Sequence, residues 1–239
     1  MSHFSVAVFT PDPHDVERIM EPFNVEDDRY FEEIPYMYKQ DYIDKYKRQH
    51  PDTPYDDEAI WRRAGFDHDH VNYDEGYIYD YFNPNGTWDY WDVGGRWRQS
   101  LCVSKHTESI GATERRDGRK TTQRGKTRWV NGARIKDVLW GKVNRASCGT
   151  FKKLGAEWDG LMALPECYQR KRALSVYGNK ENYIMWNSLF FTHAFVSMED
   201  GIWHDQDSYD RREFLEDMYN IIHNPQYQDW WIVIVDCHI

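Results

Sequence analysis

The sequence lacks the features that mark secreted, membrane-spanning and zinc-binding proteins. Its four cysteines are Cys102, Cys148, Cys167 and Cys237. No two of them form a Cys-x-x-Cys pair, and none has the spacing of a zinc knuckle. No window approaches the roughly 18 consecutive apolar residues of a membrane helix. Residues 1–9 alternate polar and apolar side chains where a signal peptide has an unbroken apolar run. We therefore expect a protein of a reducing cytoplasm, with free thiols and no membrane span.

The common catalytic motifs are absent as well. The chain has no P-loop, no Rossmann glycine fingerprint, no serine nucleophile elbow and no His-Glu-x-x-His sequence. On motif grounds this excludes the most frequent kinases, dehydrogenases, serine hydrolases and zinc proteases. Residues 67–70, Asp-His-Asp-His, alternate ligand types, but we interpret them as a solvated acidic loop. We predict no metal site and no cofactor.

Aromatic residues and charges, in contrast, are abundant and unevenly placed. The chain holds 11 Trp and 17 Tyr, more than a hydrophobic core requires, and these side chains serve both cores and binding surfaces. The net charge of −10 hides a basic middle, because residues 94–190 contain 20 Lys/Arg and 8 Asp/Glu between two acidic segments. Either a positive pocket sits in an acidic shell, or the oppositely charged segments neutralise one another in the fold.

Hydrophobic periodicity predicts strands at both ends of the chain. Residues 3–9 alternate in the manner of a half-buried strand, and the apolar run over 230–239 is typical of a strand in the centre of a sheet. Residues 190–198 and 202–204 predict a hairpin, and residues 210–223 an amphipathic helix. The predicted fold class is α+β, with a mostly antiparallel sheet in which the N- and C-terminal strands are adjacent, and with helices packed on one face.

We treat residues 1–239 as a single domain with one insertion. Residues 112–136 are polar, interrupted by glycine and rich in Arg and Lys. They predict a basic loop or hairpin that could become ordered only with a partner. Short helices are expected at 41–49 and 56–64, and a strand at 96–103.

Both terminal strands carry polar groups with catalytic potential. They are His3, Ser5, Asp236 and His238. If the two strands are antiparallel neighbours, the start of one lies beside the end of the other and these groups converge. His3 and His238 would then act as acid and base on a phosphodiester. Ser5 would position the phosphate or a nucleophile, and Asp236 would orient an imidazole. A metal site is one alternative, and simple capping of strand ends at the surface is another.

Residues 3–6, His-Phe-Ser-Val, also resemble one half of the motif of the two-histidine phosphoesterases. In that family an imidazole transfers a proton and a hydroxyl holds a phosphate, and two copies of the motif are needed. The comparable internal strand, His193-Ala194-Phe195-Val196, has Ala and Phe where the hydroxyl should be. The resemblance therefore covers half a site.

Residues 83–97 form the densest run of potential ligand contacts. Turn residues, Asn-Pro-Asn-Gly, lead into large aromatic residues and end in a Gly-Gly-Arg-Trp corner. Aromatic faces beside a guanidinium suit a planar anionic ligand such as a nucleotide. The predicted contacts are Trp88, Tyr90 and Trp97, which would stack on a base, and Arg96 and Arg98, which would hold a phosphate. Because side chains alternate along a strand, we expect part of these aromatics to pack in the core instead.

Three pieces of the chain resemble a family of uncharacterised bacteriophage and prophage proteins. Members of that family begin Met-Ser-His-Phe-Thr-Val, carry an Asn-Pro-Asn…Trp-Asp-Trp-Tyr…Gly-Gly-Arg-Trp segment and end Val-Asp-Cys-His-Ile. The matching pieces here are residues 1–6, 83–97 and 235–239. The Asp-Gly-Ile-Trp turn at 200–203 is also similar, whereas residues 204–209 depart from the Gly-Met-Gly-Trp-rich stretch usual there. The resemblance implies a phage origin and action inside the cytoplasm of a bacterial host, and it implies no reaction.

We therefore expect a phage counter-defence protein that sequesters a nucleotide-derived small molecule, an immune signal of the host. The first alternative is a phosphodiesterase-type enzyme that cleaves a nucleotide signal, such as a cyclic nucleotide, with His3 and His238. The second is a protein-binding inhibitor of a host defence factor, to which the acid-rich residues 26–33 and 52–80 point. We expect no stable binding of a nucleic-acid duplex, and the excess of Trp and Tyr is compatible with a homodimer.

Overall fold

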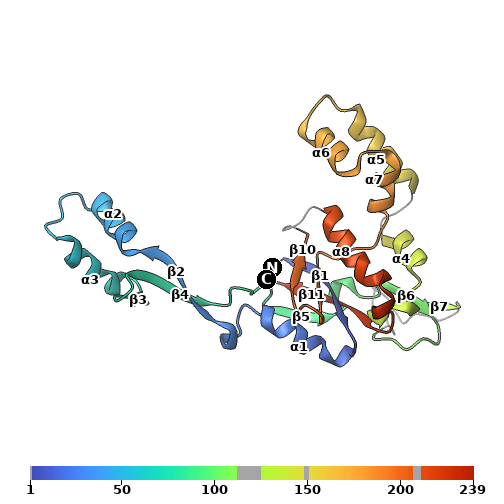
Figure 1. Cartoon of the computed structure of the whole chain (residues 1–239), viewed down its shortest axis with the longest axis horizontal. Helices are drawn as coiled ribbons and strands as arrows, with labels where there is room; N and C mark the ends of the chain where they lie inside the picture. The colour runs from blue at the N-terminus through green and yellow to red at the C-terminus, as the bar shows by residue number, and fades with distance from the viewer. Residues whose placement is uncertain (1, 112–124, 148–150, 207–210) are drawn as a thin grey trace. The chain divides into compact units, whose positions relative to one another are not determined.

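The first and last strands of the chain run side by side. The computed structural model describes residues 2–111, 125–147, 151–206 and 211–239. In it, β1 (His3–Thr10) pairs with β11 (Trp231–His238) in antiparallel register, with His3 opposite His238. The two ends of the chain consequently lie together (Figure 1). The predicted adjacency of the N- and C-terminal strands is confirmed.

β1 and β11 form the centre of a six-stranded sheet. The strand order is β10-β9-β1-β11-β5, and β8 also pairs with β11. The outer strands are β5 (Tyr90–Val93), β8 (Gly132–Arg134), β9 (Ala194–Ser197) and β10 (Trp203–Asp205). β9 is parallel to β1, and the other pairings of this sheet are antiparallel. The predicted fold class, α+β with a mostly antiparallel sheet, is confirmed.

One face of this sheet is packed against helix α8 (Arg211–His223), with α4 (Trp140–Ser147) nearby. The buried cluster on this face includes Ala7, Phe9, Ile232 and Ile234 from the strands, Val143 from α4, and Phe214, Leu215 and Met218 from α8. Because side chains alternate, Ser5 and Asp236 fall on the same face as these apolar residues. A face that is apolar under α8 therefore becomes polar toward the strand ends.

The region between β5 and α4 differs from what its sequence pattern predicted. The predicted strand at 96–103 is wrong in its first half, because Gly95–Trp97 forms a 3-10 turn (η4) before β6 (Leu101–Ser104). β6 pairs with β7 (Thr127–Val130). Of the predicted basic insertion, residues 112–124 lie outside the described residues. The part from β7 onward contributes strands, and β8 belongs to the main sheet.

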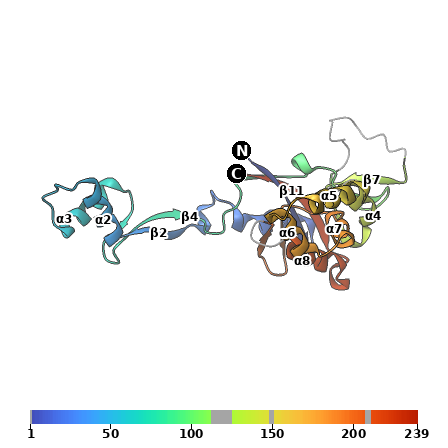
Figure 2. The same ribbon diagram turned by 90° about the horizontal axis from the view of Figure 1, so that it is seen from above.

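Helices α5 (Phe151–Ala163), α6 (Tyr168–Tyr177) and α7 (Lys180–Asn187) gather in one group (Figure 2). The sequence analysis predicted none of the three. In α6 the one buried residue is Ala173, and no apolar stripe marks that helix. The remaining short elements are η1 (Pro13–Asp15), α1 (Val16–Met20), η2 (Glu21–Phe23), η3 (Asp28–Tyr30), η5 (Ile135–Asp137) and η6 (Pro225–Tyr227). Within the described ranges, every helix is too short or too polar to cross a bilayer.

Residues Glu21–Trp88 form a compact unit separate from the one made by Met1–Met20 and Asp89–Ile239. Its sheet has the order β2-β4-β3. The elements are β2 (Glu32–Tyr38), α2 (Lys39–Gln49), α3 (Asp57–Asp67), β3 (Val71–Asn72) and β4 (Tyr77–Phe82). Its core consists of Tyr42, Ile43, Ile60, Trp61, Ala64 and Ile78. We predicted one domain, and the difference arises because this segment buries a core of its own.

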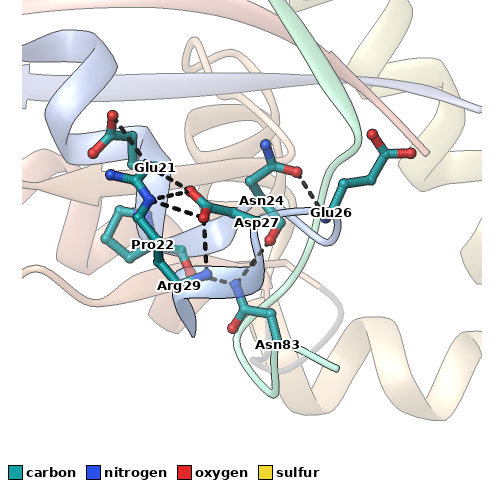
Figure 3. A network of polar contacts seen from close by, with 7 residues as sticks. All are labelled: Glu21, Pro22, Asn24, Glu26, Asp27, Arg29 and Asn83. Atoms are coloured by element: carbon teal, nitrogen blue, oxygen red, sulfur yellow. Dashed lines mark hydrogen bonds and ion pairs between the residues drawn. The ribbon is translucent and has the colours of Figure 1, made fainter. Parts of the chain in front are cut away.

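Asn83, the first residue of the Asn-Pro-Asn turn, ties the two ends of this unit together (Figure 3). Its side-chain amide donates to the carbonyl oxygens of Pro22 at 2.8 Å and Asn24 at 2.9 Å. Its Oδ1 accepts the N–H of Asn85 at 2.9 Å. The side chain is 5% exposed, so its donors and its acceptor are all used inside the protein. This part of the 83–97 segment therefore has a structural role.

Candidate functional site

The polar groups from the two ends of the chain meet on one face of the main sheet. The same-face pairs of β1 and β11 are His3 with His238 and Ser5 with Asp236. The antiparallel register thus brings together the four residues that the sequence placed at one site. A parallel pairing would have put them at opposite ends of the sheet.

The carboxylate of Asp236 holds the ring of His3. Nδ1 of His3 lies 3.0 Å from Oδ1 of Asp236, and because a carboxylate can only accept, Nδ1 carries the proton. Oδ2 of Asp236 accepts the backbone N–H of Arg96 at 2.7 Å. Asp236 is 5% exposed, and each of its two oxygens has a hydrogen-bond partner. Nε2 is therefore the nitrogen of His3 that can act on a ligand.

His238 stands next to His3, with the two ring centroids 5.1 Å apart. Nδ1 of His238 lies 2.9 Å from Oδ1 of Asp89, which is ion-pair distance, although the two atoms are not aligned for a hydrogen bond. Tyr90, on β5, packs against His238 at 4.7 Å between centroids. Each imidazole of the pair thus has a carboxylate beside its Nδ1.

Two glycines bring the chain over this site. Gly94 has a φ of 80° and Gly95 a φ of 38°, the left-handed region that favours glycine. A Cβ on Gly95 would overlap Cβ and Oδ2 of Asp236, and a Cβ on Gly94 would overlap the side chain of Asn131. Asn131 in turn accepts the N–H of Gln99 at 2.7 Å. The Gly-Gly corner is therefore required for the backbone to approach Asp236.

Ser5 is engaged with a third imidazole, that of His193. Oγ of Ser5 lies 3.1 Å from Nδ1 of His193, and the backbone N–H of Ser5 donates to the same nitrogen at 3.3 Å. Because an amide N–H can only donate, Nδ1 is an acceptor and neutral His193 carries its proton on Nε2. Val6 lies opposite Ala194 in the parallel pair of β1 and β9. The His-Phe-Ser-Val strand and the His-Ala-Phe-Val strand are consequently neighbours.

Two cavities open on this part of the protein, and Arg98 lines both. The first has a volume of about 350 Å³ and is polar; besides the imidazole pair, its lining includes Tyr90, Asp92, Arg96 and Asp236. The second has a volume of about 440 Å³ and is largely aromatic; its lining includes Ser5, His193, Trp97, Trp129, Phe190 and Phe191. A charged compartment thus adjoins an aromatic one.

The structure places four of the five residues predicted to contact a nucleotide at these two cavities. Tyr90 is 57% exposed and lines the first cavity with Arg96 and Arg98. Trp97 lines the second, with its ring 5.5 Å from that of His193. Trp88 is 5% exposed and belongs to residues 21–88, so its buried indole does not fit the stacking role predicted for it. The physical reason is that Trp88 forms a β-bridge with Asn24 instead of starting β5.

The sequence did not assign Asp89, His193 or Asn131 to the site. Asp89 and His193 become partners of His238 and Ser5 through strand register, which no local pattern specifies. The available signals were weak: Asp89 lies within the aromatic segment, and His193 begins the strand that was compared with residues 3–6.

In the ranges that the structure describes, no three His, Cys, Asp or Glu side chains gather in a way that could hold a metal ion. Within the Asp-His-Asp-His segment, His68 hydrogen-bonds Tyr36 at 2.9 Å and the ring of His70 stacks on Tyr79. These imidazoles serve packing in the unit of residues 21–88.

Alkylation should distinguish the buried cysteines from the partly exposed one. Cys102 and Cys237 are fully buried, and burial raises the pKa of both thiols, that of Cys237 with a further contribution from Asp236. Thiolate is the reactive form, so we expect both to resist iodoacetamide at neutral pH while the partly exposed Cys167 reacts. Peptide mapping by mass spectrometry, with unfolded protein as control, measures this. Rapid labelling of native Cys237 would contradict the central position of β11. Cys148 lies outside the described residues.

Comparison with protein-family models, with curated proteins and with solved structures found no match to this chain. The arrangement of side chains at the polar end of the sheet is therefore the basis for proposing a function.

Proposed function

We propose that the polar end of the main sheet binds a nucleotide-derived phosphodiester and cleaves it by general acid–base catalysis between His3 and His238. The observation that carries this proposal is the pair of imidazoles, 5.1 Å apart between ring centroids, with a carboxylate beside Nδ1 of each. Two rings at this spacing can contact oxygens of the same phosphate group. Imidazole is also the side chain best suited to proton transfer near neutral pH.

In the proposed reaction, one neutral imidazole removes a proton from a water molecule as the water oxygen attacks phosphorus. The new P–O bond forms while the P–O bond to the leaving oxygen breaks. The second imidazole, protonated beforehand, gives its proton to that leaving oxygen. Asp236 pairs with Nδ1 of His3, and Asp89 lies 2.9 Å from Nδ1 of His238, so Nε2 is the nitrogen of each ring that acts on the phosphate.

The lining of the two cavities supports a ligand with a phosphodiester between planar rings. Arg96 and Arg98 supply guanidinium groups, and one imidazolium adds a further positive charge to offset the carboxylates of Asp92 and Asp236. Tyr90 offers an exposed ring face at the first cavity. The second cavity offers aromatic side chains to another ring. A cyclic or linear dinucleotide has this composition.

Sequestration without turnover is the second candidate, and the aromatic second cavity favours it. Binding against Trp97, Trp129 and Phe190 requires no proton transfer. In either case we propose a host immune signal as the ligand and counter-defence as the role, by analogy with other small phage proteins, since the resemblance implies a phage origin only.

A thermal-shift screen of the whole chain against mono-, di- and cyclic nucleotides tests both candidates. A ligand present at a hundred times its Kd stabilises the protein by about 2.7 kcal/mol, which should raise the melting temperature by several degrees. Chromatography of the ligand recovered from the denatured sample then separates them, since a cleaved ligand supports the phosphodiesterase and an intact ligand supports sequestration. A screen without any shift would contradict both.

A further inference from the structure

The three-stranded sheet within residues 21–88 has one packed face and one open face. Ile78, the second residue of β4, is fully buried with residues of α2 and α3. Its neighbours Tyr77 and Tyr79 point to the other face, followed by Tyr81, and the register puts Tyr38 of β2 opposite Tyr77. Tyr38 is 59% exposed and Tyr81 is 48% exposed. We call these four residues the tyrosine face.

The rings of the tyrosine face form a continuous row. Successive centroids lie 6.4 Å apart for Tyr38 and Tyr77, 6.0 Å for Tyr77 and Tyr79, and 5.3 Å for Tyr79 and Tyr81, all edge to face. His70 stacks on Tyr79 with 5.4 Å between centroids. Rings already held by one another lose little freedom on binding, which favours their use as contact surface.

Negative charge accompanies these rings. Glu33 lies opposite Tyr81, and its carboxylate accepts the hydroxyl of Tyr77 at 2.7 Å, which raises the pKa of that phenol. The strands β2, β3 and β4 contain no Lys or Arg. Residues 21–88 hold 17 Asp/Glu and 7 Lys/Arg, which gives this unit a formal charge of −10. The net charge of the whole chain has the same value, so the rest of the chain is neutral on balance.

We propose that the tyrosine face docks an arginine-rich segment of another protein. A guanidinium is planar and weakly hydrated, so it can stack flat on a tyrosine ring and also pair with a carboxylate such as that of Glu33. A lysine ammonium is compact and strongly hydrated, and it gains less from a row of rings. The negative charge disfavours nucleic acids on the same surface. This inference does not depend on the acid–base site of His3 and His238.

Fluorescence anisotropy with the full chain tests the docking of such a segment. The probes are a labelled peptide of Arg-Gly-Gly repeats and the matched peptide of Lys-Gly-Gly repeats. We expect the arginine peptide to bind more tightly, and the double variant Tyr79→Leu, Tyr81→Leu to weaken that binding by about tenfold. Tyr55→Leu is the matched control, because Tyr55 is 50% exposed but lies outside the three strands. It should leave the affinity unchanged.

Two further variants keep the test decisive if the double variant does not fold, as judged by circular dichroism. Tyr38→Leu changes the most exposed ring, and Glu33→Gln removes charge while keeping the shape; each should weaken the arginine peptide severalfold. Equal affinity for the two peptides, or binding that these substitutions leave unchanged, would overturn the proposal. Light scattering measures whether the chain associates with itself. If it does, and the variants lose that association, the tyrosine face binds a second copy of the chain and the proposal is overturned as well.

Discussion

Replacing either imidazole of the His3–His238 pair with alanine should lower phosphodiester cleavage by about two to four orders of magnitude. Each substitution removes one partner of the proton transfer while the arginines and aromatic rings of the two cavities remain. We therefore expect kcat to fall and ligand affinity to change little. Because the two rings act as a unit, the double variant should be only slightly slower than either single variant. Turnover of the ligand found in the screen, with calorimetric binding in parallel, measures both quantities.

His14→Ala is the matched control, since His14 is exposed and lies outside both cavities. It should retain wild-type turnover. The wild-type pH–rate profile should be bell-shaped, because one ring must be neutral and the other protonated. In each single alanine variant, the pH–rate profile should lose either its acidic or its basic limb. Full turnover in both His3→Ala and His238→Ala would refute the acid–base proposal. A ligand that the wild-type protein binds but leaves intact would refute it too, and sequestration would be the remaining candidate.

Gly95→Ala should destabilise the unit made by residues 1–20 and 89–239 by about 3 kcal/mol and reduce ligand binding. Part of the cost comes from holding alanine at a φ of 38°. The rest arises because the new Cβ overlaps Asp236, so the turn must move away and the N–H of Arg96 leaves Oδ2. Asp236 would then lose one of the two contacts that fix it beside His3. Denaturation followed by tryptophan fluorescence, together with ligand titration, measures both effects.

Gly201→Ala separates the backbone cost from the overlap. Gly201 also has a positive φ, of 65°, but nothing lies within 4 Å of the position that a Cβ would take. We expect a loss of about 1 kcal/mol at this position and unchanged ligand binding. If the two alanine variants were equally stable and bound ligand equally well, the close approach of the Gly-Gly corner to Asp236 would not matter for the site.

Elements with a strong local pattern were predictable from the sequence. The alternation of residues 3–9 and the apolar run at the C-terminus predicted β1 and β11, and the apolar stripe of 210–223 predicted α8. Helices α6 and α7 were missed because they bury few residues. Trp88 shows the opposite error: it begins an aromatic run in the sequence that predicted ligand contacts, yet it forms a bridge with Asn24 and is buried in the unit of residues 21–88.

The sequence by itself determined two features of the site. Alternation places polar side chains on the otherwise apolar face of the terminal strands, and the Gly-Gly pair before Arg96 allows a tight turn there. Those properties follow from side-chain alternation and backbone freedom, which are local. The tertiary structure decided which groups become partners. Asp236 faces His3, Asp89 lies beside His238, and His193 contacts Ser5, although the two residues of every pair lie far apart along the chain. Strand order and register set these distances, and both depend on how the whole core packs rather than on any one segment.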